Sequence, residues 1–116
     1  MMIPAIEAIF GNKTAAGVLL FLENYGSGYA SQIARTYDVP VSVVQDQLRK
    51  LEFAGLLVSR TVGRTRLFEF NPRNPTVRRL RTFLAEELKA LPESLVKQYF
   101  RERQRPRRSG KAIERA

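Results

Sequence analysis

Polar side chains recur along one face of a predicted helix near the middle of the chain. Ser42, Gln45, Asp46 and Arg49 are spaced three or four residues apart, so an α-helix would carry them on one side. Glutamine can form paired hydrogen bonds with adenine, and arginine can bind guanine or phosphate. The pattern therefore indicates a helix face that is able to contact a DNA duplex.

These side chains also have local roles open to them. Ser42 and Gln45 fit the S-x-x-Q capping box, which would begin the helix directly after Ser42, whereas Pro40 would begin it two or three residues earlier. Arg49 would otherwise be a solvated helix arginine. Asp46 suits DNA poorly, because phosphates repel a carboxylate unless it accepts a hydrogen bond from a cytosine amino group.

A second candidate site is a basic hairpin that follows this helix. Residues 57–62 and 66–70 are β-branched or aromatic in part, which predicts two strands joined by a turn that contains Gly63. Three arginines belong to this hairpin, namely Arg60, Arg64 and Arg66, and Glu69 is the nearby acid. We expect them to contact phosphates or the minor groove, and a loop whose charge serves only solubility is the alternative.

The polar helix face belongs to a longer stretch, Tyr29 to Leu57, and the basic hairpin follows it directly. This stretch reads as a short helix, a turn and a longer helix. Asp38 lies in the turn and tolerates a left-handed conformation better than most side chains. Proline disfavours helical geometry in the residue before it, so Val39-Pro40 ends the first helix, and Gly55 is suited to end the second. The inward side chains are expected to be Ile33, Ala34, Val39, Val44, Leu48 and Leu51.

Two further helices are expected before this stretch. Pro4 suits a first helical position and Gly11 offers a stop, so a short N-terminal helix is predicted between them. Asn12 is a good N-cap for the next segment, which has a broad apolar face. Residues 26–28, Gly-Ser-Gly, are typical of a loop.

The segment from Ser42 to Pro72, SVVQDQLRKLEFAGLLVSRTVGRTRLFEFNP, resembles part of the winged helix-turn-helix regulators, in particular the ArsR-like and MarR-like families. It is similar to their recognition helix, their L-x-x-L-x-x-A-G-L segment and their basic wing. The resemblance implies that the helix enters the major groove and that the wing touches adjacent backbone or minor groove. By position, the DNA-binding residues would be Val41, Ser42, Gln45, Asp46 and Arg49 on the helix and Arg60, Arg64, Thr65 and Arg66 in the wing.

Composition supports a nucleic-acid partner and argues against catalysis. The chain has 116 residues, is 44% hydrophobic and carries a formal charge of +9, which fits one compact domain with a polyanionic partner. The first 58 residues sum to −1 and the remainder to +10, so the basicity lies after the second helix of the stretch. No nucleophile, general base or phosphate-binding glycine loop is assembled, and we expect no enzyme.

Cysteine and histidine are both absent, which removes thiolate chemistry and the usual zinc ligands. The metal-sensor role of some members of the resembled families is therefore not implied, and no cofactor is expected. The longest apolar run, Ala15 to Leu22, is far shorter than the ~20 residues of a membrane span. Without a basic region at the start that would indicate a signal peptide, we expect a cytoplasmic protein that has no membrane partner.

The C-terminal part is expected to make a homodimer. Asn74-Pro75 is a strong start for a long helix, and Pro92 begins another short one. Apolar residues recur on these helices at three- and four-residue steps, and the predicted interface comprises Val77, Leu80, Leu84, Leu88, Leu91, Leu95 and Tyr99. The alternative is that the two helices fold back on their own domain.

These observations predict a mainly α fold with a small β-hairpin wing. Residues 1–74 would form the winged helix-turn-helix domain with its N-terminal helix, residues 75–103 the dimerisation helices, and residues 104–116 a basic, disordered tail. The predicted function is a homodimeric regulator that binds double-stranded DNA in a sequence-specific way. The alternative is a winged-helix module that docks a protein partner through its C-terminal helices, and the sequence gives no indication of an effector.

Overall fold

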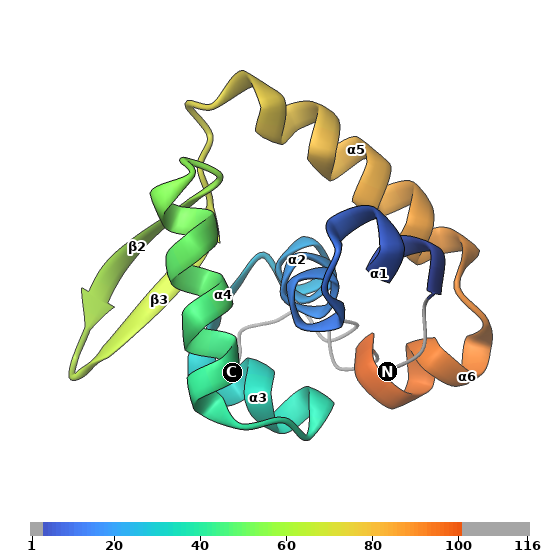
Figure 1. Cartoon of the computed structure of the whole chain (residues 1–116), viewed down its shortest axis with the longest axis horizontal. Coiled ribbons are helices and arrows are strands. Elements are labelled where there is room, and N and C mark those ends of the chain that lie inside the picture. Colours follow the sequence, from blue (N-terminus) through green and yellow to red (C-terminus); the bar gives the residue numbers. More distant parts are fainter. Residues whose placement is uncertain (1–3, 101–116) are drawn as a thin grey trace, which may run out of the picture.

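The computed structural model describes residues 4–100, which form helices around a small antiparallel sheet (Figure 1). In chain order the elements are α1 (Pro4–Phe10), α2 (Lys13–Tyr25), β1 (Ser27–Tyr29), α3 (Ala30–Tyr37), α4 (Val41–Phe53), β2 (Leu57–Val62), β3 (Thr65–Phe70), α5 (Pro75–Ala90), α6 (Glu93–Leu95) and η1 (Val96–Phe100), the last a single π-helical segment. The fold class is the predicted one, mainly α with a hairpin wing. The predicted basic tail, 104–116, lies outside the described residues.

Helix α2 is the centre of the domain. Its N-cap is Asn12, as predicted, and the Asn12 side chain accepts hydrogen bonds from the backbone N–H groups of Thr14 and Ala15 at 2.7 and 3.0 Å. Every residue from Ala15 to Leu22 is buried, because α1, α3, α4, α5, β1, β3 and η1 all contact this helix. Figure 1 shows α2 almost end-on, with the other helices arranged around it.

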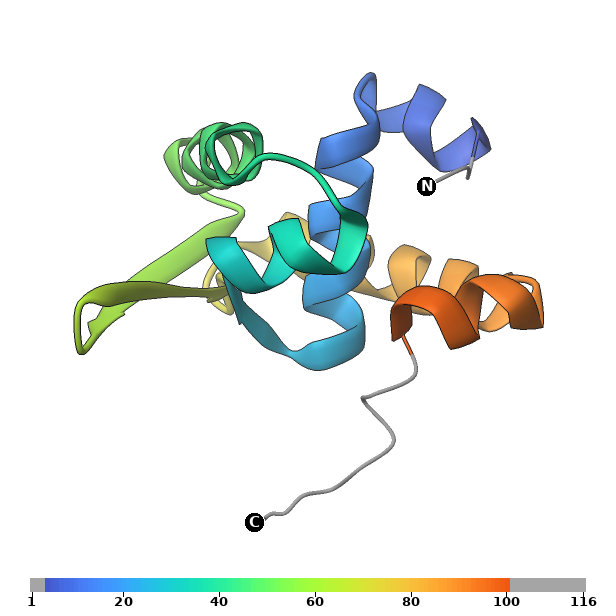
Figure 2. The same ribbon diagram turned by 90° about the horizontal axis from the view of Figure 1, so that it is seen from below.

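The turn between α3 and α4 has the predicted left-handed residue. Asp38 has φ 57° and ψ 53°, and it is the one non-glycine residue with a positive φ among residues 4–100. Ile33 and Ala34 of α3 and Val44 and Leu48 of α4 are buried where the two helices meet. Packing of these side chains therefore holds α4 against α3. Figure 2 shows the domain from below, with α4 seen almost end-on.

The sheet has three strands in the order β1-β3-β2, all antiparallel. Residues 26–28 were expected to be a loop, but Ser27 and Gly28 belong to β1 and pair with Glu69 and Phe68 of β3. A strand of three residues is too short to show the alternation of apolar and polar side chains that predicts a strand. The absence of a side chain matters at Gly28, because a Cβ there would lie 2.6 Å from a ring carbon of Phe21.

The C-terminal helices fold back on their own domain. Val77 and Leu84 of α5 are 3% and 0% exposed, and Phe100 at the end of η1 is 1% exposed. Other residues of the predicted dimer stripe pack partly against the same core, namely Leu80, Leu88, Leu91, Leu95 and Tyr99. Within this chain the C-terminal helices therefore fold back, which was the alternative prediction. Most residues of the predicted dimer interface already have intramolecular contacts.

Polar contacts hold η1 against α2. The Asn24 amide donates to the carbonyl of Phe100 at 3.1 Å, and the Tyr25 hydroxyl donates to the carbonyl of Tyr99 at 2.8 Å. The Tyr99 ring also lies 5.3 Å from the ring of Tyr37, at the end of α3. Among the described residues, no helix is long and apolar enough to cross a membrane.

Candidate nucleic-acid interface

A cleft between α4 and the wing brings most of the predicted DNA-binding residues together. Its volume is about 450 Å³. Six of the predicted side chains line it, three from α4 (Val41, Gln45 and Arg49) and three from the wing (Arg64, Thr65 and Arg66). Figures 1 and 2 show the β2–β3 hairpin projecting from the domain beside α4. The cleft lies between these two elements.

The three remaining predicted residues are exposed but do not line the cleft. Ser42 and Asp46 are on α4, and Arg60 is on β2, where it pairs with Leu67 of β3. Arg60 therefore extends from the body of the hairpin and not from its turn. The residues farthest along the hairpin are Gly63, which has φ 62°, and Arg64.

Helix α4 begins at Val41 with Pro40 as its N-cap, which decides between the two starts that the sequence left open. Ser42 is consequently the second residue of the helix and not its cap, so the expected S-x-x-Q capping box does not form. Neither Ser42 nor Gln45 has a side-chain hydrogen bond to a capping position. Both side chains are exposed and remain available for an external ligand.

The unfavourable carboxylate of Asp46 has a partner on its own helix. Arg49 donates from Nη1 to Oδ1 of Asp46 at 3.3 Å, and both side chains are about two-thirds exposed, at 68% and 67%. An ion pair this exposed contributes little to stability. Its consequence is electrostatic, because the guanidinium offsets the carboxylate that would face a phosphate backbone.

The wing side chains are held by contacts within the hairpin. The Arg66 guanidinium donates to the hydroxyl of Thr61 at 3.1 Å, and the Thr65 hydroxyl donates to the carbonyl of Val62 at 3.0 Å. Arg64 has no such contact among the described residues. The end of the wing therefore has one oriented arginine and one that is free to move toward a ligand.

The structure adds residues to the cleft that the sequence pattern did not indicate. Tyr29, the last residue of β1, and Ser31 of α3 line it, as do Glu52 of α4 and Phe68 of β3. The Ser59 hydroxyl, on β2, donates to a carboxylate oxygen of Glu52 at 2.6 Å and so connects α4 to the wing. The two residues lie on different elements, a helix and a strand, so no spacing within one element marked this pair.

The charges in the cleft favour an anionic ligand. Three guanidinium groups line it, those of Arg49, Arg64 and Arg66, against the carboxylate of Glu52. Low-dielectric walls on both sides strengthen the field of such an arrangement. No group of three or more metal-ligating side chains occurs in the part of the chain that the structure describes.

The arrangement of helices and wing is shared with solved bacterial proteins. The adhesin competence repressor AdcR from Streptococcus pyogenes matches with a TM-score of 0.53 and 13% identity, over 85% of this chain and 77% of that one. ZitR from Lactococcus lactis, in an apo form, matches with a TM-score of 0.52 and 20% identity, over 84% of this chain and 75% of that one. Comparison with protein-family models finds no match, and comparison with curated proteins finds none.

At these identities the likeness establishes the fold. The chain has a winged helix-turn-helix fold, with α3 and α4 as the helix-turn-helix and β2 and β3 as the wing. This is the fold that the resemblance of the segment from Ser42 to Pro72 implied.

Proposed function

We propose that this chain is a sequence-specific DNA-binding transcriptional regulator that acts as a homodimer. The observation that carries the proposal is the cleft in which Gln45 and Arg49 of α4 face Arg64 and Arg66 of the wing. In this arrangement α4 enters the major groove, where Gln45 and Arg49 reach base edges. The wing arginines contact the flanking backbone or the minor groove.

The roles of the α4 residues follow from their position. Val41 is 39% exposed at the first turn of the helix, where an apolar side chain can contact a thymine methyl group. Ser42 lies in the same turn, so its hydroxyl can bind a phosphate together with free backbone N–H groups. Asp46 stays paired with Arg49 or accepts from a cytosine amino group.

The proposed homodimer interface is the part of the predicted dimerisation residues that stays partly exposed at the C-terminal end. Leu91, Leu95 and Tyr99 keep part of their surface in the protomer, whereas Val77 and Leu84 are buried and can only position α5. Two copies would place their α4 helices about 34 Å apart on one side of the duplex, which requires a near-palindromic operator. A cytoplasmic location follows for a regulator of this kind.

Two parallel measurements test the proposal. Selection of bound sequences from random duplex DNA at moderate salt should enrich a near-palindromic site, and the mass in solution should be twice the 13.3 kDa of one chain. Gln45→Ala should change base preference at one position in each half-site, at a cost of roughly 1 to 3 kcal/mol. Thr82→Ala, on α5 and outside the lining of the cleft, is the control and should leave the enriched sequence unchanged.

An interaction module that docks a protein partner is the second candidate. The apolar residues of the C-terminal helices present a smaller free surface to a partner than the sequence indicated, because much of that surface packs against the core of the same domain. Phe53, at the end of α4, is 95% exposed and is the side chain that favours such a contact. A monomeric chain that enriches no DNA sequence would support this second candidate and would refute the first.

A further inference from the structure

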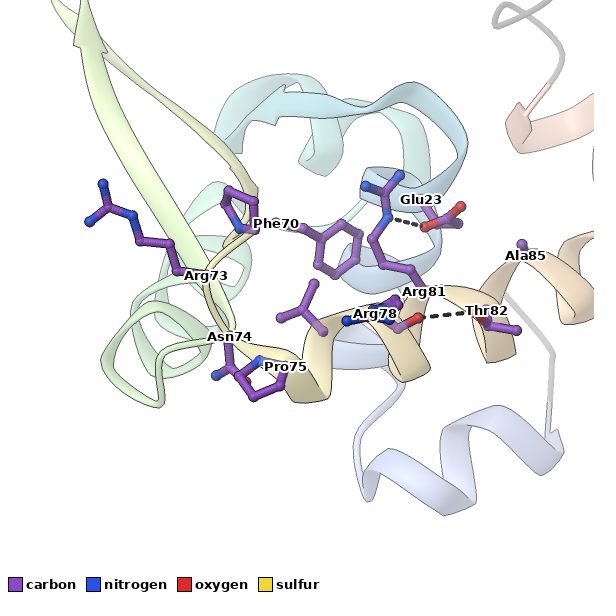
Figure 3. A pocket seen from close by; sticks show the side chains of 11 residues that line it. Glu23, Phe70, Arg73, Asn74, Pro75, Arg78, Arg81, Thr82 and Ala85 are labelled. Atoms are coloured by element: carbon purple, nitrogen blue, oxygen red, sulfur yellow. Dashed lines mark hydrogen bonds and ion pairs between the residues drawn. The ribbon is translucent and has the colours of Figure 1, made fainter.

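A second cavity lies at the base of the wing and is separate in its lining from the cleft beside α4. We name it the wing-root cavity, and its volume is about 710 Å³, within the range of sites for small molecules. It is lined by the end of α2, the last residue of β3, the loop that follows and α5 as far as Ala85 (Figure 3). No residue is shared between the linings of the two cavities.

Arg81 is the cation of the wing-root cavity that other side chains hold in place. Its Nε donates to a carboxylate oxygen of Glu23 at 2.7 Å, and its guanidinium lies 5.1 Å from the centre of the Phe70 ring. These two contacts fix the side chain, which is still 46% exposed. Its two terminal nitrogens have no partner among residues 4–100, and Figure 3 shows them on the far side of the guanidinium from α5.

Arg78 adds a second cation on the same side of α5. It precedes Arg81 by three residues, so one turn of helix separates two side chains that both line the cavity. Its guanidinium has no hydrogen bond or ion pair within the described residues. Arg73 also lines the cavity, although Figure 3 shows its side chain extending away from Arg81.

The cavity therefore has more positive charge than its own acid can offset. Glu23 is the one carboxylate in the lining, its side chain is 14% exposed, and it already accepts from Arg81. The remaining lining is largely apolar, with Phe70, Val77 and Ala85 beside the arginines. One guanidinium that is held in place and a second one nearby, next to apolar side chains, are suited to a ligand that is anionic at one end.

We propose that the wing-root cavity binds a small oxyanion, the phosphate or carboxylate group of a small molecule, through Arg81 and Arg78. The two terminal nitrogens of Arg81 form a planar fork that can donate two parallel hydrogen bonds to one such group. Arg78 contributes charge from the preceding turn, and the apolar lining contacts the carbon skeleton. The proposal concerns the protein without DNA, so it does not depend on the proposed regulator function.

The test uses the arginine Nε–Hε NMR signals of the full chain, titrated separately with inorganic phosphate and with acetate. Sodium chloride keeps the ionic strength constant. A saturable shift of the Arg81 signal is expected with one or both anions, and the arm with the lower Kd identifies the preferred group. If neither anion gives a saturable shift up to about 50 mM, where even a millimolar Kd would be saturated, the proposal is wrong.

Matched variants separate a site from general attraction to a basic protein. Arg78→Ala should weaken anion binding by about threefold or more, because it removes one of the two cations while leaving the Arg81–Glu23 pair intact. Arg79→Ala removes the same charge from the adjacent position of α5, outside the cavity lining, and should leave Kd unchanged. Equal weakening by both variants would refute a specific site.

Arg81→Lys keeps the charge but removes the planar fork. We expect it to lose most of the affinity for either anion, since an ammonium group cannot donate in the same paired geometry. Thermal unfolding followed by circular dichroism reports whether this variant folds. A folded Arg81→Lys chain that binds as tightly as the parent would contradict the role of the fork.

Discussion

Single side chains of the cleft differ in how firmly they are positioned. Arg66 is held by Thr61, and Arg49 by Asp46, whereas Arg64 has no partner among the described residues. Oriented guanidinium groups lose less conformational freedom on binding than free ones do. Arg66 should therefore contribute more to affinity than Arg64, while each neutralises one phosphate.

Replacement of the wing arginines tests this assignment. Arg64→Ala and Arg66→Ala should each lower the slope of log Kobs against log salt by about one unit, because one fewer counterion is released from the DNA. Titration of the selected duplex at several salt concentrations, followed by fluorescence anisotropy, measures the slope. Arg79→Ala on α5 is the matched control and should leave the slope unchanged. A slope that neither wing variant lowers would refute the wing assignment.

Tyr37 gives the fold a dependence on alkaline pH. Burial raises the pKa of its phenol well above the usual 10.0, with a smaller rise from the nearby Tyr25 and Tyr99, and its hydroxyl donates to the carbonyl of Gly17 at 2.8 Å. The unfolded chain then loses this proton near pH 10, while the folded chain retains it. The stabilisation is complete below pH 10 and is lost progressively as the pH rises toward the folded-state pKa.

Urea unfolding at pH values from 8 to 11 measures this effect. The free energy of unfolding of the parent should fall above pH 10, and Tyr37→Phe should fall less steeply. The phenylalanine variant also loses the hydrogen bond to Gly17, so its stability at pH 8 should be lower by about 0.5 to 1.5 kcal/mol. An identical decrease in both proteins above pH 10 would assign it to other groups.

At the scale of elements, one contact couples α4 to the wing. The hydrogen bond from Ser59 to Glu52 is 2.6 Å long and partly buried, and it joins the C-terminal half of α4 to β2. Glu52, which lines the cleft, thereby has a hydrogen-bond donor and does not present a free carboxylate there. The hydrogen bond joins α4 to the wing.

Ser59→Ala should loosen this connection. We expect a loss of stability of about 0.5 to 1.5 kcal/mol and a weaker affinity for the selected DNA, because Glu52 is left without its hydroxyl donor. Ser94→Ala, at an exposed position of α6, is a matched control and should change neither quantity. Unchanged DNA affinity in Ser59→Ala, alongside reduced stability, would limit the contact to a structural role.

At the scale of the whole molecule, α5 belongs to the same core as the helix-turn-helix. Leu84 has no exposed surface, α5 packs on α2, and Arg81 stacks on Phe70 at the end of β3. Any dimer that uses the C-terminal helices is therefore connected through α5 to both α2 and the wing.

Truncation of Leu84 measures how much α5 contributes to this core. Leu84→Ala should lower the free energy of unfolding by about 2 to 5 kcal/mol, because it leaves a cavity between α5 and the domain. Leu91→Ala, at a half-buried position just after α5, should cost less in a monomer. Chemical unfolding of both variants at low protein concentration compares them, and equal costs would contradict the burial of the stripe in the protomer.

Local sequence signals anticipated much of the fold because the forces involved act over a few residues. Asn12 and Asn74 cap helices as expected, and Asp38 adopts the left-handed conformation. Strand β1 was missed, since three residues including a glycine gain their structure only by pairing with β3. The start of α4 was ambiguous because Pro40 and Ser42 both carry start signals.

The polar face of α4 and the basic hairpin are properties of the sequence alone, since helical spacing and a glycine-containing turn define them without any long-range contact. The tertiary structure decided which of those side chains share a cleft, and it separated Ser42, Asp46 and Arg60 from the other six. It also joined Glu52 to Ser59 and placed Arg81 between Glu23 and Phe70. These pairings depend on how α2, α4, α5 and the sheet pack, and packing between distant segments leaves no local spacing in the sequence.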